Sequence, residues 1–149
     1  MTDHETEEEL VKRFLRYVKV PSQSEANGGV KVPSTESQWD MAHLLQEELN
    51  ALGMADVSLS DKCVLTGYLP ANLPTGAPHV PAVGFCAHMD TVDVSLSPVV
   101  KPRRVRYEGG DIVLNEKENI VMRAAEHPEL APYVGQELIV TDGTSVLGA

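Results

Sequence analysis

One pair of ionisable residues has the types and the spacing of a metal site: His88 and Asp90 follow directly after the apolar run 82–87. If that run is a strand, residues two apart project from the same face, so the two side chains can meet. A neutral imidazole is a good zinc ligand, and a nearby carboxylate commonly fixes its orientation and raises its basicity. A His and an Asp at a strand end more often just bond to each other and to solvent, so the spacing alone leaves both interpretations open.

The segment that must position this pair is the run 82–87 itself. It is almost continuously apolar, which is typical of a strand buried on both faces of a mixed or parallel sheet. Ionisable residues at the end of such a strand lie at the sheet edge where α/β folds usually build their sites. Four prolines between residues 70 and 81 exclude a central strand there and predict a connection that crosses the surface.

Two amphipathic helices are predicted before this strand. The first begins at a capping box formed by Thr6 and Glu9, and a proline at position 21 ends it. The second begins at a capping box formed by Thr35 and Gln38, carries a leucine-rich stripe, and closes at Gly53. The Ser-, Gly- and Asn-rich segment between them predicts a long surface loop.

Shorter elements complete the predicted architecture. The runs 57–59 and 64–69 predict a hairpin, residues 116–126 a helix, and residues 137–140 a last strand. Gly109 and Gly110 permit a tight turn. Together these patterns predict an α/β fold, in which a mixed sheet is flanked by helices, and composition favours one globular unit for the 149 residues.

Charge and composition restrict the partners and the compartment. A formal net charge of -10 repels phosphate backbones and anionic lipid headgroups, so we expect neither nucleic acid nor a membrane as partner. The N-terminus lacks the basic and apolar regions of a signal peptide, and no apolar run reaches membrane-spanning length, so we expect a cytoplasmic protein. Cys63 and Cys86 lie in apolar runs without CxxC spacing, which favours reduced core thiols. The remaining histidines are expected to be surface or packing residues: His4, His43, His79 and His127.

Five segments of the sequence resemble motifs of a known enzyme family; they lie at 32–39, 69–72, 83–93, 107–112 and 141–149. The segment 83–93 resembles the first metal motif of the co-catalytic di-zinc aminopeptidases and carboxypeptidases. The other four resemble the peptidase T family in particular. Because the five segments run in the family's order and cover nearly the whole chain, chance agreement is improbable.

The resemblance implies the N-terminal portion of a zinc-peptidase catalytic domain, in an enzyme that holds two zinc ions and releases the N-terminal residue from tripeptides. His88 resembles a ligand of one zinc ion, and Asp90 resembles the catalytic-site carboxylate that supports it. The family's bridging aspartate, general-base glutamate, other zinc ligands and lid or dimerisation domain would follow Ala149. A catalytic zinc needs about three protein ligands, so we expect the 149-residue chain alone to retain no zinc and to be inactive.

Other interpretations stay open. A different di-zinc amidohydrolase, such as a dipeptidase or deacylase, would share the spacing of His88 and Asp90. A truncated, inactive scaffold that only binds a partner would share the fold. The expected partners of the enzyme are small peptides, tripeptides above all. A sheet that ends just after its last predicted strand exposes an edge, so we also expect either self-association into homo-oligomers or disordered ends.

Overall fold

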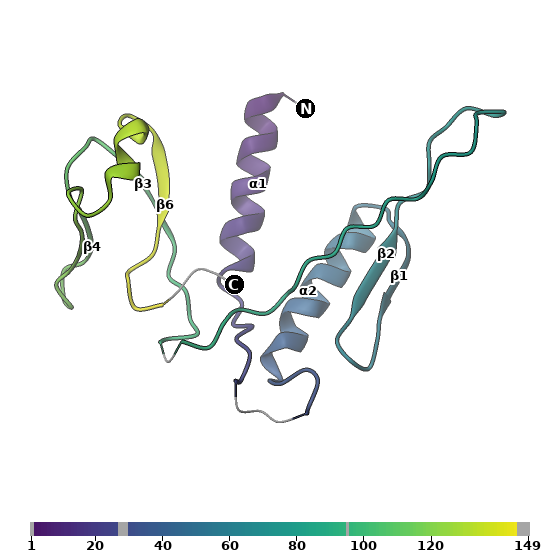
Figure 1. Ribbon diagram of the computed structural model, residues 1–149, viewed down its shortest axis with the longest axis horizontal. Coiled ribbons are helices and arrows are strands. Elements are labelled where there is room, and N and C mark those ends of the chain that lie inside the picture. The colour runs from purple at the N-terminus through teal and green to yellow at the C-terminus, as the bar shows by residue number, and fades with distance from the viewer. Residues whose placement is uncertain (1, 27–29, 95, 146–149) are drawn as a thin grey trace. The chain divides into compact units, whose positions relative to one another are not determined.

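The computed structural model describes residues 2–26, 30–94 and 96–145 of the chain (Figure 1). These residues divide into two compact units, whereas composition led us to expect one. The described residues of Ser22–Thr91 form the first, which we call the central unit. Those of Met1–Pro21 and Val92–Ala149 form the second, which we call the terminal unit.

The central unit is built from a helix packed on a hairpin. Helix α2 (Ser37–Ala51) lies against the antiparallel strands β1 (Ala55–Leu59) and β2 (Leu65–Tyr68), as Figure 1 shows. Met41 and Ala42 are buried residues of α2. A Cβ on Gly67 of β2 would lie 3.3 Å from the terminal methyl carbon of Met54, so a glycine here lets the hairpin approach its neighbours closely. The predicted hairpin is therefore confirmed.

The predicted second helix is also confirmed, but its predicted capping box is wrong. The Thr35 hydroxyl donates to the Gln23 carbonyl oxygen at 2.8 Å, and the Gln38 amide donates to the Ser34 hydroxyl at 3.3 Å. Glu36 takes the N-cap position without a side-chain hydrogen bond to the helix. The polar residues that looked like a helix cap instead join α2 to the segment that precedes it. Gly53, with φ of 76°, follows the end of the helix as predicted.

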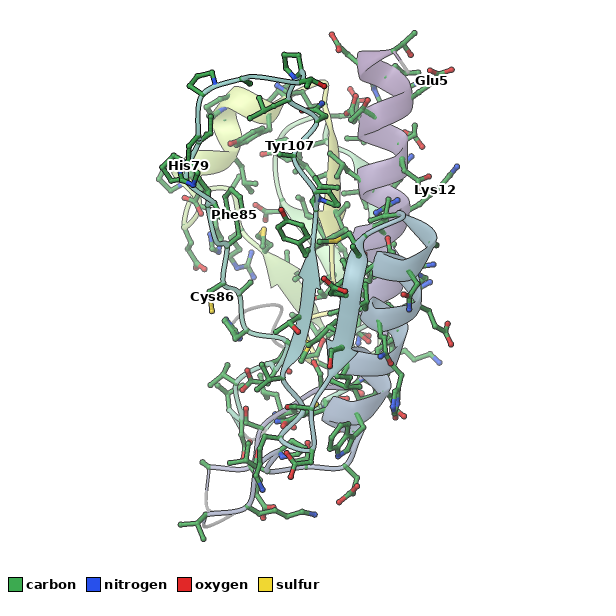
Figure 2. The ribbon with its side chains drawn as sticks, turned by 90° about the vertical axis from the view of Figure 1, so that its right-hand side faces the viewer. Glu5, Lys12, His79, Phe85, Cys86 and Tyr107 are labelled. Atoms are coloured by element: carbon green, nitrogen blue, oxygen red, sulfur yellow. The ribbon has the colours of Figure 1, made fainter. Side chains whose placement is uncertain are left out.

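The predicted buried strand at 82–87 is wrong. This segment is not in a strand, and Val83 and Phe85 are 77% and 97% exposed. The Phe85 side chain is labelled in Figure 2. A strand needs ladder hydrogen bonds to a neighbour, and no described strand pairs with this segment. Cys86 is accordingly exposed, contrary to the expectation of a core thiol, whereas Cys63 is buried as expected. Burial raises the pKa of the Cys63 thiol.

Helices and strands are both present, as the α/β prediction requires, but the single mixed sheet is not. The described strands form three separate two-stranded antiparallel sheets. The first is the β1–β2 hairpin. In the second, β3 (Arg103–Arg106) pairs with β6 (Glu137–Val140), and in the third, β4 (Ile112–Asn115) pairs with β5 (Ile120–Met122). The segment 82–87 would have been the centre of a mixed sheet, and without it each strand pairs only with one partner. The last strand, β6, has the predicted bounds.

The terminal unit begins with helix α1 (Asp3–Tyr17), which starts earlier than predicted. Its capping box is formed by Thr2 and Glu5: the Thr2 hydroxyl accepts from the Glu5 N–H at 3.2 Å, and the Glu5 carboxylate accepts from the Thr2 N–H at 2.7 Å. The guanidinium of Arg104 on β3 donates to both carboxylate oxygens of Glu8 at 3.0 Å, which joins α1 to the β3–β6 pair. Neither α-helix of the described ranges has the length and apolar character needed to traverse a bilayer.

The predicted helix at 116–126 is wrong, because a turn and a strand occupy this region. The side-chain oxygen of Asn115 accepts from the backbone N–H groups of Lys117 and Glu118 at 3.1 and 3.2 Å. Asn119 adopts a left-handed φ of 53°, which asparagine tolerates better than most residues. The chain then reverses into β5, which pairs with β4. The short 3-10 helix η1 (Pro128–Tyr133) follows, and the predicted turn at Gly109 and Gly110 is confirmed by φ values of 93° and 78°.

Candidate functional site

The predicted pair does meet in the central unit. His88 Nδ1 lies 2.9 Å from the backbone oxygen of Asp90 and 3.1 Å from its carboxylate oxygen Oδ1. The predicted reason was wrong, since the contact arises from the local path of an irregular segment and not from the alternation of a strand. Both neighbours of Nδ1 are acceptors, so Nδ1 must carry the proton and donate. The lone pair of the neutral imidazole then lies on Nε2, which is the arrangement of a metal-binding histidine.

A third residue, Ser24, joins this pair from 66 positions earlier in the chain. Its hydroxyl donates to Oδ2 of Asp90, the oxygen that His88 does not use. The backbones of the two segments also pair, through an isolated parallel bridge between Gln23 and Thr91. The Ser24 N–H donates to the Thr91 oxygen at 2.9 Å, and the Thr91 N–H donates to the Ser22 oxygen at 3.1 Å. Sequence reasoning missed Ser24, because a serine in a polar loop carries no signal for a partner so far along the chain.

The hydrogen bonds to Asp90 favour its ionised form. The hydroxyl of Ser24, with a smaller contribution from His88, holds the pKa of the Asp90 carboxyl below its usual range, against a weaker opposing effect of burial. An ionised Asp90 accepts strongly from the Nδ1–H of His88. The His88 side chain is 60% exposed, so the imidazole is accessible to a ligand.

The fit of these residues to zinc is partial. His88 offers one imidazole nitrogen of the right chemistry, and Asp90 offers the carboxylate that orients it. Within residues 2–26, 30–94 and 96–145, no group of three or more His, Cys, Asp or Glu side chains is placed to hold a metal ion. A catalytic zinc takes about three protein ligands. The described residues thus supply one candidate ligand with its support, and not a whole zinc site.

The other histidines were expected to be surface or packing residues. His43 stacks on Trp39 with ring centroids 6.1 Å apart, and Nδ1 of His127 lies 2.8 Å from the Glu129 carboxylate. His79 is exposed in the proline-rich connection (Figure 2). Residues 146–149, the end of a segment that contributed to the family resemblance, lie outside the described residues.

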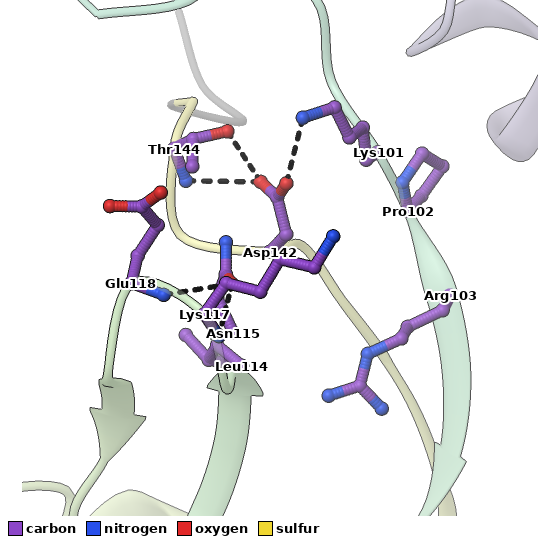
Figure 3. Close-up of a pocket in the computed structure, with 9 residues that line it drawn as sticks. All are labelled: Lys101, Pro102, Arg103, Leu114, Asn115, Lys117, Glu118, Asp142 and Thr144. Carbon is purple, nitrogen blue, oxygen red and sulfur yellow. Dashed lines mark hydrogen bonds and ion pairs between the residues drawn. The ribbon is translucent and has the colours of Figure 1, made fainter.

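A second polar cluster lies in the terminal unit, around Asp142 (Figure 3). Asp142 accepts from the Thr144 hydroxyl at 2.6 Å, from the Thr144 N–H at 3.0 Å, and from the Lys101 ammonium at 3.0 Å. The Thr144 bonds, with a smaller contribution from Lys101, lower the pKa of Asp142 from 3.8 to about 2. Gly143 between them has a φ of 74°, which glycine adopts readily. The cluster is explained as a turn that follows strand β6.

The sequence of this chain is similar to those of peptidase T proteins. No family model matches, but the chain is 48% identical over 142 residues to a peptidase T-like protein of Yersinia pestis, and 46% identical over 142 residues to one of Rhizobium meliloti. It is 46% identical over 143 residues to the peptidase T of Geobacillus kaustophilus. Each match covers 95% of this chain and 33–34% of the relative. The chain is thus homologous to peptidase T and its relatives, as the sequence predicted, and spans about a third of their length.

Proposed function

We propose that this chain forms part of the catalytic domain of a zinc-dependent aminopeptidase that releases the N-terminal residue from tripeptides. The homology to peptidase T supports the peptidase activity. The observation that carries the proposal is the geometry of His88, whose Nδ1–H is held by Asp90 so that Nε2 is free to bind a metal ion. In this proposal His88 binds one of two zinc ions, and small cytoplasmic peptides are the substrates.

The roles of the two residues follow from their contacts. When bound, zinc would polarise the peptide carbonyl and lower the pKa of a bound water. His88 would hold the metal through a neutral imidazole nitrogen. Asp90 keeps the ring in the correct tautomer and makes Nε2 more basic, because its negative charge stabilises the proton on Nδ1. Since the described residues offer one such ligand, we expect the 149-residue chain alone to bind no stoichiometric zinc and to cleave no tripeptide.

The test measures zinc content and tripeptide turnover in the protein encoded by the whole gene, and compares the wild type with two histidine variants. We expect stoichiometric zinc and release of the N-terminal residue. His88→Ala should lower kcat/KM by more than about 100-fold, because the loss of even an outer-shell partner of a metal site costs 10–100-fold. His79→Ala is the matched control, since this exposed histidine lies in the same unit and should leave activity unchanged.

The other outcomes distinguish the alternatives. Zinc-dependent cleavage of dipeptides or acylated amino acids, without tripeptide turnover, would replace the proposal with a different amidohydrolase activity. A protein that contains no zinc and cleaves none of these substrates would contradict the proposed function altogether and favour a scaffold that only binds a partner.

A further inference from the structure

The segment that carries Ser24 is held by the turn before α2. The Thr35 hydroxyl donates to the Gln23 oxygen at 2.8 Å, and the Ser34 hydroxyl accepts from the Glu25 N–H at 3.0 Å. These bonds act on the residues immediately before and after Ser24. The position of Ser24 is therefore set by the folded core of the central unit and not by a free loop.

The segment around Ser24 is also joined to Thr91, which follows Asp90 in the sequence. The backbone bonds between Ser24 and Thr91, and between Thr91 and Ser22, bring Asp90 within reach of the Ser24 hydroxyl. A chain of contacts thus runs from the turn before α2 through Ser24 and Asp90 to His88. The links are hydrogen bonds between described residues of the central unit, except the covalent step from Gln23 and Glu25 to Ser24.

The two oxygens of the Asp90 carboxylate have separate partners. Oδ1 faces His88 Nδ1 at 3.1 Å, and Oδ2 accepts from Ser24. A carboxylate held through one oxygen can still rotate about its Cβ–Cγ bond, because this terminal torsion has a broad energy profile. A second bond, to the other oxygen, removes that freedom. Ser24 therefore determines whether Oδ1 stays directed at the imidazole.

We propose that Ser24 is a positioning residue for His88: it fixes the Asp90 carboxylate, which keeps the proton of His88 on Nδ1 and leaves Nε2 free for a divalent metal ion. The identity of the metal as zinc rests on the proposed function above. The positioning itself does not, since it concerns only contacts within the metal-free chain. Ser24 touches neither metal nor substrate, so its effect on them is indirect.

The first test is nitrogen NMR of His88 in the metal-free chain, at a pH where the imidazole is neutral. We expect the wild type to show the Nδ1–H tautomer. Ser24→Ala should shift part of the population toward Nε2–H, because the carboxylate is then no longer held toward Nδ1 and the Asp90 backbone oxygen, at 2.9 Å, is the acceptor that remains. Ser24→Thr keeps a hydroxyl donor and should restore the wild-type spectrum, whereas Ser24→Cys, a weaker donor, should give an intermediate one.

Ser22→Ala is the matched control, two residues away on the same segment. Ser22 is 1% exposed, and its hydroxyl has no hydrogen-bond partner among the described residues, so its removal should leave both folding and the His88 tautomer unchanged. The proposal is overturned if folded Ser24→Ala keeps the wild-type tautomer, or if Ser22→Ala changes it equally. Should Ser24→Ala fail to fold, a wild-type spectrum in folded Ser24→Cys overturns it in the same way.

The second test measures metal affinity in the protein encoded by the whole gene, by competition with a chelator for Zn²⁺. Ser24→Ala should weaken zinc binding by about 10-fold, the lower end of the effect of an outer-shell partner, and Ser24→Thr should recover it. Different results would contradict the proposed zinc-dependent function and the positioning role of Ser24. A wild type that binds no zinc contradicts the proposed function, while an unchanged tautomer in Ser24→Ala contradicts the positioning role.

Discussion

Asp90 and Asp142 lie in different units and show what a lowered carboxyl pKa does and does not indicate. Both accept a hydrogen bond from a hydroxyl group, and in both this bond is the main cause of the lowered pKa. The hydroxyl partner of Asp142 is Thr144, two residues along the chain. That of Asp90 is Ser24, 66 residues away.

The second partner of each aspartate makes the difference in function. Asp142 is paired with the Lys101 ammonium, which has no lone pair to offer a metal ion. Asp90 is paired with an imidazole whose other nitrogen is left with a lone pair. A lowered pKa is thus common to a structural turn and a candidate metal site, and the chemistry of the partner separates the two.

The largest expected effect separates the two aspartates directly. Asp90→Asn removes the charge that holds the His88 proton on Nδ1, and should weaken zinc binding by the whole-gene protein by about 10–100-fold. Asp142→Asn should leave zinc affinity unchanged, because its partners are Thr144 and Lys101. Chelator competition measures both affinities. Equal losses in the two variants would contradict the distinction between them.

A smaller effect is expected from the turn after β6. Thr144→Ala removes the hydroxyl that donates to Asp142 at 2.6 Å and should lower the free energy of unfolding by about 1 kcal/mol, the usual contribution of one hydrogen bond. Thr144→Ser retains the donor and serves as the control. Urea unfolding of the three proteins gives the values. If alanine and serine are equally destabilising, packing of the threonine methyl group is responsible and not the hydrogen bond.

The smallest expected effect is a dependence of stability on acid pH. The folded-state pKa of Asp142 is about 2, below its ordinary value of 3.8, so ionised Asp142 stabilises the fold above 3.8, and this contribution is lost as the pH falls toward 2. The effect is modest because Lys101 is 61% exposed and solvent screens the pair.

The measurement follows the difference in unfolding free energy between wild type and Asp142→Asn as a function of pH. This difference should be constant near neutral pH and should shrink between 3.8 and about 2. A difference that grows as the pH falls through this range would show that the folded-state pKa is raised and not lowered.

Two of the elements that were predicted correctly have stabilising partners that are close in sequence, whereas strand β6 was predicted correctly although it pairs with the distant strand β3. Helix α2 and the β1–β2 hairpin follow one another along the chain, so helical periodicity and a short turn sufficed to predict them. The strand at 82–87 was predicted from apolar character alone, and the structure gives it no pairing strand. The helix at 116–126 was predicted without allowing for the turn that Asn115 and Asn119 form.

The same distinction applies to the candidate site. The types and spacing of His88 and Asp90 were sufficient to predict their contact, since two residues apart in sequence are never far apart in space. Ser24 became part of the site only through the backbone bridge between Gln23 and Thr91 and the bonds from Ser34 and Thr35. Hydrogen bonds between distant polar segments leave no periodic pattern in the sequence, so only the tertiary structure brought this third residue to the carboxylate.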